Sequence, residues 1–130
     1  MIKYTIMLPV YNKIECLKKY FSKVINQNFS DYEVIVVDDF STDGSYEYLK
    51  QLEKSCNRLT LYRNEKNMGI GYTRNKLISS AKGKYLLFVD PDDYIEEILL
   101  QELDKYYNLD LDIIRFQNVI EPVGANQILK

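Results

Sequence analysis

The chain has 130 residues, 46% of them hydrophobic and 28% charged, a balance typical of a single globular domain that occupies residues 1–130. The formal net charge of −2 provides no positive field for a phosphate backbone, which argues against nucleic acid as a partner. The chain contains no histidine, so a histidine base and a histidine-bound metal are excluded within these residues, and carboxylates must carry the chemistry.

Two cysteines, Cys16 and Cys56, fall within segments of helical pattern, which is poor material for a disulfide framework. We therefore expect reduced thiols and a location in the cytoplasm or at the cytosolic face of a membrane. The apolar run at residues 6–10 is too short to span a bilayer and has no small-residue cleavage site. No secretion signal and no transmembrane segment are predicted in this chain.

Apolar runs of strand length recur along the chain and alternate with segments of helical spacing. The predicted strands are residues 4–10, 33–37, 59–62, 85–89 and 112–116. Their apolar residues are mostly continuous rather than alternating, which is typical of strands covered on both faces in a parallel sheet. The pattern predicts an α/β fold with an open, mostly parallel sheet and helices on both faces.

Four segments between or after these strands have helical spacing, and the second of them covers residues 45–56. The apolar positions are Ile14, Leu17, Phe21, Val24 and Ile25 in the first, Ile70, Leu77, Ile78 and Ala81 in the third, and Ile95, Leu99, Leu103 and Tyr106 in the fourth. Asn12 and Glu15 have the spacing of a capping box at the start of the first helix, and Gly83 is expected to end the third.

Open parallel sheets bind ligands beyond the carboxyl ends of their strands, so the residues that follow each strand form the candidate site. Residues 9–12 follow the first strand, 38–41 the second, 64–71 the third and 90–93 the fourth. Two acidic groups, at residues 38–39 and 90–93, are therefore expected to meet at one edge of the sheet.

The sequence Asp90-Pro91-Asp92-Asp93 places three carboxylates within four residues at a strand end. Such carboxylates repel one another unless a cation lies between them, and Mg²⁺ or Mn²⁺ bound there can bridge a diphosphate and stabilise its charge. The alternative is that Asp93 caps the next helix, with Glu96 as its capping-box partner, and that the other carboxylates are solvated. Capping uses only one carboxylate, so the two interpretations are compatible.

Asp38 and Asp39 precede a turn-forming run and are compatible with a plain connection from strand to helix. A carboxylate at this edge can instead accept the N3 proton of uracil, a donor that cytosine lacks. Tyr11, which follows the first strand, can stack on the same base or can serve only in packing.

Residues 67–71 open the third helix and contain Gly69 and Gly71, so their backbone N–H groups can approach a phosphate. The run is not a Rossmann fingerprint, because the spacing G-x-G-x-x-G is absent and no such run follows the first strand. Arg74, further along the same helix, can face either a diphosphate or a neighbouring aspartate.

Five motifs resemble, in order and spacing, those of the family-2 glycosyltransferases. They are Leu8-Pro9-Val10-Tyr11-Asn12, Val36-Val37-Asp38-Asp39-Phe40-Ser41-Thr42-Asp43-Gly44, Asn67-x-Gly69, Arg74-Asn75 and Phe88-Val89-Asp90-Pro91-Asp92-Asp93, within residues 4–116. The resemblance implies the GT-A nucleotide-diphospho-sugar transferase fold. It also implies transfer of a sugar, with inversion, from a nucleotide donor that is commonly UDP-linked, with Mg²⁺ or Mn²⁺, to a polysaccharide, lipid-linked or other glycan acceptor.

The resemblance also implies roles for particular residues. The expected nucleotide-binding residues are Pro9, Val10, Tyr11, Asp39, Asn67, Arg74 and Asp92, and the expected metal ligands are Asp90, Asp92 and Asp93. Within this set Pro9, Tyr11 and Asp39 would surround the uridine, and Asp90-Pro91-Asp92 occupies the place of the family's Asp-x-Asp motif. Phe40 stands where the family usually has a small residue, so its ring would either tighten the entrance beside Asp39 or help to wall the base.

Members of this family are longer than 130 residues and carry the catalytic base and the acceptor site in the additional part. We therefore expect the general base beyond Lys130. The chain is interpreted as a truncated, N-terminal nucleotide-sugar-binding part that lacks the acceptor-binding part and does not complete the transfer by itself.

Three alternatives come from other classes of protein. A catalytically idle nucleotide-binding module would bind the nucleotide without turnover. A phosphoacceptor receiver domain shares the acidic pair and Mg²⁺, but its pair follows the first strand, whereas Asp38 and Asp39 follow the second. A nucleotidylyltransferase would carry a loop rich in glycine and arginine where this chain has Tyr11-Asn12-Lys13.

Overall fold

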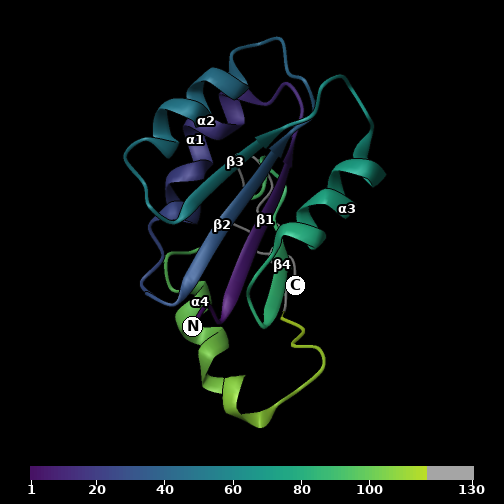
Figure 1. The fold of residues 1–130 in the computed structure, drawn as a ribbon. Coiled ribbons are helices and arrows are strands. Elements are labelled where there is room, and N and C mark those ends of the chain that lie inside the picture. The colour runs from purple at the N-terminus through teal and green to yellow at the C-terminus, as the bar shows by residue number, and fades with distance from the viewer. Residues whose placement is uncertain (117–130) are drawn as a thin grey trace, which may run out of the picture.

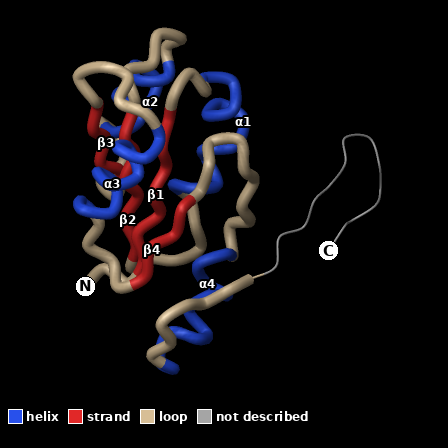
Figure 2. The backbone as a smooth tube through the Cα atoms, turned by 90° about the vertical axis from the view of Figure 1, so that its right-hand side faces the viewer, coloured by secondary structure: helices blue, strands red, loops and turns tan. Residues whose placement is uncertain are grey.

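The computed structural model describes residues 1–116 as an α/β fold built on a four-stranded sheet. The strands are β1 (Tyr4–Val10), β2 (Tyr32–Asp38), β3 (Leu59–Arg63) and β4 (Tyr85–Phe88). The helices are α1 (Ile14–Ile25), α2 (Ser45–Glu53), α3 (Ile70–Ser80) and α4 (Leu99–Leu103), followed by the 3-10 helix η1 (Asp104–Leu109). Figures 1 and 2 show α1 and α3 on opposite sides of the sheet.

All strand pairs are parallel, and the strands lie in the order β3-β2-β1-β4. The first strand of the chain is therefore central, because Tyr4 pairs with Tyr32 of β2 on one side and with Tyr85 of β4 on the other. Parallel neighbours need a crossover, and α1, α2 and α3 provide one between each pair of consecutive strands. This topology confirms the open parallel sheet and brings the carboxyl ends of β1, β2 and β4 to one edge.

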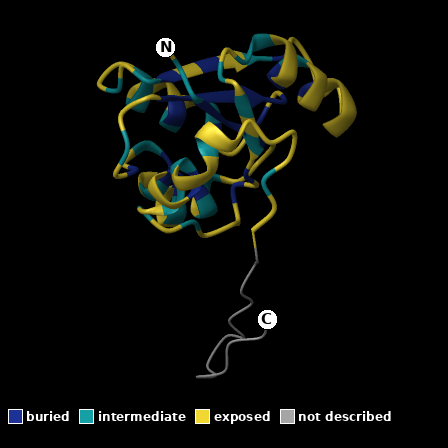
Figure 3. Ribbon diagram, turned by 90° about the horizontal axis from the view of Figure 1, so that it is seen from below, coloured by how far each residue is buried: buried dark blue, intermediate teal, exposed yellow. Residues whose placement is uncertain are grey.

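The core lies on both faces of the sheet. Every residue of β1 and β2 is buried, as their continuous apolar runs predict. Successive side chains point to opposite faces: Ile6 and Leu8 join the cluster that includes residues of α1, α2 and α4, whereas Met7 and Ile35 pack with Leu77 of α3. Figure 3 shows the buried residues concentrated in the sheet. Helices therefore cover both faces, as expected.

The predicted strand at residues 112–116 is wrong, because these residues form no ladder with any described strand. Ile114 packs against the core cluster that includes Tyr4 of β1, so the apolar run does contact the core. The hydroxyl of Tyr85 donates a hydrogen bond to the carbonyl oxygen of Leu111, at 2.5 Å. An apolar run predicts contact with the core, but a strand also needs a neighbour that shares its backbone hydrogen bonds.

Two of the predicted helices also differ in extent. The helix expected from Ile95 onwards begins only at Leu99, and beyond Leu103 it tightens into η1. The third helix ends at Ser80, before Gly83. A Cβ atom at Gly83 would lie 2.6 Å from the backbone nitrogen of Thr5, so glycine at this position permits close packing against β1 rather than ending α3.

The cysteine residues have free thiols, as expected. Cys16 lies in α1, but the prediction that Cys56 lies in a helix is wrong, since α2 ends at Glu53. In residues 1–116, none of the helices combines the length and the apolarity that crossing a membrane demands.

Candidate functional site

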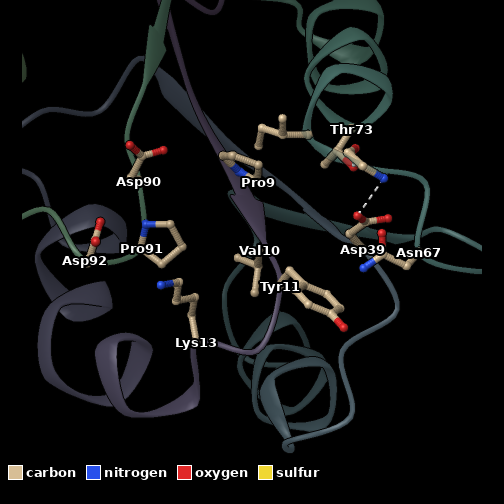
Figure 4. A pocket seen from close by; sticks show the side chains of 12 residues that line it. Pro9, Val10, Tyr11, Lys13, Asp39, Asn67, Thr73, Asp90, Pro91 and Asp92 are labelled. Atoms are coloured by element: carbon tan, nitrogen blue, oxygen red, sulfur yellow. Dashed lines mark hydrogen bonds between the residues drawn. The ribbon is translucent and has the colours of Figure 1, made fainter.

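A cavity of about 460 Å³ opens at the carboxyl edge of the sheet. It is lined by Pro9, Val10, Tyr11, Lys13, Asp39, Asn67, Gly69, Ile70, Thr73, Asp90, Pro91 and Asp92. These residues lie at the end of β1, in the segments that follow β1, β2 and β4, or at and just before the start of α3, where ligands bind in open parallel sheets. Figure 4 shows Asp39 and Asn67 on one side of the cavity, Asp90 and Asp92 on the other, and Tyr11 between them.

The end of β1 provides the floor of the cavity and an exposed aromatic ring. Pro9 and Val10 line the cavity, and Val10 is 1% exposed, so this part is fixed by the core. Tyr11 is 46% exposed and also lines the cavity. The chain turns at Asn12, whose φ of 51° lies in the left-handed region that asparagine tolerates. The turn leaves the ring of Tyr11 accessible to a planar ligand.

The loop after β1 is tied to the loop after β2 by reciprocal hydrogen bonds. The backbone N–H of Asn12 donates to Ser41 Oγ at 2.9 Å, and the backbone N–H of Thr42 donates to Asn12 Oδ1 at 2.7 Å. The backbone N–H of Lys13 donates to Ser45 Oγ at 2.9 Å. These bonds hold the two loops in register, so the positions of Tyr11 and Asp39 depend on each other.

Asp43 caps α1, and the predicted capping box of Asn12 and Glu15 is wrong. Asp43 Oδ2 accepts the backbone N–H of Ile14, the first residue of α1, at 3.1 Å, and Oδ1 accepts the N–H of Ser45 at 2.9 Å. Desolvation raises the pKa of Asp43, but the hydrogen bonds from Ser45 and Ile14 outweigh it, and the pKa lies below its usual value. The side chain of Asn12 instead serves the loop contact with Thr42.

Asp38 does not line the cavity and instead stabilises the turn after β2. It is fully buried, its Oδ2 accepts the backbone N–H of Ser41 at 2.9 Å, and the same oxygen lies 3.5 Å from Arg63 Nε. The Arg63 guanidinium lies 4.8 Å from the ring centroid of Phe40 and 4.4 Å from that of Tyr46. The two aspartates of the predicted acidic pair therefore have different structural roles, and only Asp39 lines the cavity.

Phe40 does not line the cavity, so the expected narrowing beside Asp39 is wrong. Its φ is 66°, a left-handed conformation that is unfavourable for a residue with a large side chain. This backbone geometry is a physical reason for a small residue at the position. In this chain the contact of the ring with Arg63 offsets part of the strain.

Asp39 is the most strongly hydrogen-bonded carboxylate of the cavity, and only 5% of it is exposed. Its Oδ1 accepts from Asn64 Nδ2 at 2.8 Å and from the backbone N–H of Met68 at 2.7 Å. Its Oδ2 accepts the backbone N–H of Gly69 at 3.0 Å. A carboxylate has about four acceptor positions, so roughly one remains free, and it lies on Oδ2.

Residues 90–93, which we call the acidic turn, lie on the opposite side of the cavity, where Asp90, Pro91 and Asp92 line it. Asp90, Asp92 and Asp93 are exposed, and one carboxylate oxygen from each lies within 4.8 Å of the others. The backbone N–H of Asp90 donates to Asp93 Oδ2 at 3.2 Å, and that of Asp93 to the Asp90 carbonyl oxygen at 2.9 Å. The alternative role of Asp93 as a helix cap is wrong, because the next helix, α4, begins at Leu99.

The structure brings most of the predicted residues to the cavity, but Arg74 and Asp93 do not line it. Asn67 lines the cavity, whereas Arg74 does not, and its guanidinium lies 5.8 Å from the ring centroid of Phe88. Two lining residues, Lys13 and Thr73, were not predicted. Lys13 directly follows the Tyr11-Asn12 motif and could have been selected on that ground. Thr73 had no such signal, because its position depends on how α3 packs.

Comparison with known proteins places this chain among glycosyltransferases. The model of the family "Glycosyl transferase family 2" matches residues 5–125. A poly(ribitol-phosphate) beta-glucosyltransferase of Bacillus spizizenii is 41% identical over 111 residues, which cover 82% of this chain and 17% of the relative. The chain therefore spans less than a fifth of the length of this relative.

Solved structures agree with the fold. The crystal structure of Staphylococcus aureus TarS 1-349 in complex with UDP-GlcNAc has a TM-score of 0.76 and 31% identity, over 83% of this chain and 32% of that one. A mannosyltransferase of Pyrobaculum calidifontis in complex with GDP-Man and Mn2+ has a TM-score of 0.72 at 23% identity, over 80% of this chain and 32% of that one, and supports the fold alone. These neighbours confirm the GT-A type of architecture.

Proposed function

The chain belongs to glycosyl transferase family 2, and from this premise we propose that it binds the nucleotide-sugar donor of an inverting glycosyltransferase. The proposed donor is UDP-linked, and the proposed acceptor is a polysaccharide, lipid-linked or other glycan. One observation carries the proposal: a single cavity joins an accessible aromatic ring, Tyr11, a hydrogen-bonded carboxylate, Asp39, and the acidic turn.

We assign the nucleobase to the side of the cavity formed by Tyr11, Asp39 and the start of α3, which we call the base side. The ring of Tyr11 offers a stacking surface, and Asp39 has one free acceptor position on Oδ2. Uracil presents one N–H donor, N3–H, which matches a single acceptor. The structural neighbour that binds UDP-GlcNAc supports this choice of base. The part of Arg74 in nucleotide binding stays a prediction.

The acidic turn fits a divalent cation. Asp90, Asp92 and Asp93 bring three carboxylate oxygens close together, and oxygen is the donor atom that Mg²⁺ and Mn²⁺ prefer. A cation held there would supply charge stabilisation for the diphosphate leaving group. Asp39, on the other side of the cavity, would meanwhile hold the base, so the two acidic groups fix the two ends of the nucleotide.

Lys13 is the residue that we add to the donor site. It lines the cavity together with Asp90 and Asp92, and its backbone is fixed by Ser45. An ammonium group on a flexible stem can approach a diphosphate that lies between the base side and the acidic turn. It would attract the donor electrostatically and offset part of the negative charge of the cavity.

We further propose that this chain corresponds to the donor-binding part of a longer enzyme. The relatives that it matches are several times longer, since the chain covers 17% of one and 32% of another. In such an enzyme the acceptor site and the general base would come from the additional part, and this chain alone would transfer sugar slowly. The cytosolic location also stays a prediction.

Calorimetry with UDP tests the donor site. We expect binding in the presence of Mn²⁺ and clearly weaker binding in EDTA, because the diphosphate would otherwise meet the acidic turn as a like charge. Equal affinity in the two buffers would rule out the role assigned to the cation. With UDP-sugars and Mn²⁺, binding without release of UDP, even with acceptors, would favour the idle nucleotide-binding module.

A further inference from the structure

The hydrogen bonds of Asp39 limit what its carboxylate can recognise. Oδ1 already accepts two hydrogen bonds, from Asn64 Nδ2 and from the backbone of Met68. An oxygen of a carboxylate offers about two acceptor positions, so Oδ1 has none left for a ligand. Oδ2 accepts only the N–H of Gly69 and keeps one position. A ligand at the base side therefore finds one acceptor, not a pair.

The orientation of the Asn64 amide is fixed by its surroundings. Asn64 is 3% exposed, and its Nδ2 donates to Asp39 Oδ1 and to Thr73 Oγ1, at 2.8 and 3.0 Å. The Thr73 hydroxyl gives its own proton to the carbonyl oxygen of Gly69, at 2.8 Å, and so must accept from Asn64. With acceptors on both sides, the NH₂ group of Asn64 faces Asp39 and cannot be exchanged for the amide oxygen.

The backbone of Asn64 is also held in place. Its N–H donates to the carbonyl oxygen of Asp38, at 2.9 Å, immediately beyond the last pair of β2 and β3. Asp39 follows Asp38 directly, so the donor and the acceptor of the side-chain hydrogen bond are fixed on adjacent strands. A carboxylate held in this way cannot rotate to present both oxygens to the cavity.

We propose that Asn64 is a positioning residue which makes the base side select a base with one N–H donor, uracil, over guanine. Guanine presents two neighbouring donors, N1–H and N2–H, and pairs best with both oxygens of a carboxylate. At this site one of those donors would face Oδ1, which already accepts two hydrogen bonds, and would stay unpaired. The unpaired donor lowers the affinity for a guanine nucleotide. The proposal rests on the proposed function, because it assumes that Asp39 meets the base.

The test is the ratio of the dissociation constants of GDP and UDP, measured by calorimetry with Mn²⁺. For the unaltered chain we expect UDP to bind about tenfold tighter or more, as the unpaired donor on guanine implies. The N64A variant releases the carboxylate of Asp39, and we expect it to lose UDP affinity while the ratio narrows by about threefold or more. In the D39N background, N64A should leave the ratio unchanged.

Circular dichroism would show whether N64A folds. A second variant, N64D, replaces the amide by a carboxyl group of nearly the same shape and provides the test if N64A does not fold. At neutral pH the introduced carboxylate repels Asp39, so UDP binding should weaken. As the pH falls towards 5, that carboxylate gains a proton, can again donate to Asp39, and should restore affinity relative to the unaltered chain at the same pH. A carboxylate that only disturbed packing would also gain a proton in acid, but it would weaken UDP and GDP equally, so the ratio of the two dissociation constants is measured at each pH.

The outcomes separate the two proposals. If the unaltered chain binds neither UDP nor GDP, the proposed function fails and the role of Asn64 fails with it. If it binds UDP, but the Asn64 variants weaken UDP and GDP equally at every pH, the donor site stands and the positioning role is overturned.

Discussion

The two acidic groups of the cavity differ in almost every physical respect. Asp39 is 5% exposed and accepts three hydrogen bonds from the protein. The carboxylates of the acidic turn are exposed, and the hydrogen bond described between Asp90 and Asp93 joins members of the turn itself. The base side is thus organised by the fold in advance, whereas the acidic turn presents charge that a cation can organise.

Because of this difference, we expect substitutions on the two sides of the cavity to affect stability and binding differently. A change at the base side removes contacts that belong to the folded chain, so stability and nucleotide binding should fall together. A change in the acidic turn removes an exposed charge, so the effect should fall on cation-dependent binding alone. The substitutions below test whether the two sides can be separated in this way.

The largest effect is expected for D39N. An amide at residue 39 keeps only one acceptor oxygen, so its NH₂ group must face either the N–H of Gly69 or the donors of Asn64 and Met68. We expect a loss of roughly 2 to 4 kcal/mol of unfolding free energy. Binding of UDP should weaken about tenfold or more, because a charged hydrogen bond to the base is lost. Urea denaturation and calorimetry measure the two effects. A D39N variant as stable as the unaltered chain would contradict the assignment.

The substitution D92N is the matched control for D39N, because it makes the same aspartate-to-asparagine change in the acidic turn. Asp92 is exposed, so the free energy of unfolding should change by less than about 0.5 kcal/mol. Affinity for UDP in Mn²⁺ should fall on the order of tenfold, because the cation loses a charged ligand, and the difference should vanish in EDTA. If D92N instead weakened binding equally in both buffers, Asp92 would not act through a cation.

A smaller effect is expected for D43A, which removes the acceptor shared by Ile14 and Ser45. The loss of a helix cap costs about 1 to 2 kcal/mol of stability. The link between the loops after β1 and β2 should loosen, with a modest loss of UDP affinity. The matched variant D31A changes an exposed aspartate away from the cavity and should cost less than about 0.5 kcal/mol.

The smallest effect concerns pH. The pKa of Asp43 is below its usual value in the folded chain, so its contribution to stability is complete above the usual value and is lost as the pH falls through the lowered one. The stability difference between the unaltered chain and D43A should therefore be constant near neutral pH and shrink below about pH 4. Thermal denaturation of both proteins from pH 7 to 3 measures it. A constant difference throughout would contradict the charged cap.

Sequence patterns predicted the sheet and the motifs around the cavity because both depend on local information. A buried parallel strand such as β2 is recognisable from its continuous apolar run, and strand ends identify residues such as Tyr11, Asp39 and Asp92. The run at residues 112–116 is also apolar in part but has no strand partner within residues 1–116, and composition cannot reveal that difference.

The contacts that organise the site were not predictable, because they join residues far apart in the chain. Asp43 caps a helix that begins 29 positions earlier, and Asn64 meets Asp39 across 25 positions. An asparagine that follows a strand can also take many structural roles, so its position in the sequence does not predict its partner. Only the pairing of β2 with β3 shows that Asn64 lies behind the carboxylate of Asp39.

The strand order also sets a sequence of events during synthesis. Tyr4 of the central strand meets Tyr32 of β2 first, whereas its partner on the other side, Tyr85 of β4, emerges from the ribosome much later. The segment between Tyr4 and Tyr85 is nearly three times as long as the segment between Tyr4 and Tyr32. Closing the longer loop therefore costs roughly 1 kcal/mol more in chain entropy. A nascent chain that ends before β4 already contains Tyr11, Asp39 and Asn64, but its central strand still has an open edge. The growing protein can therefore assemble its base side while it is being translated, and of the parts of the cavity the acidic turn joins last.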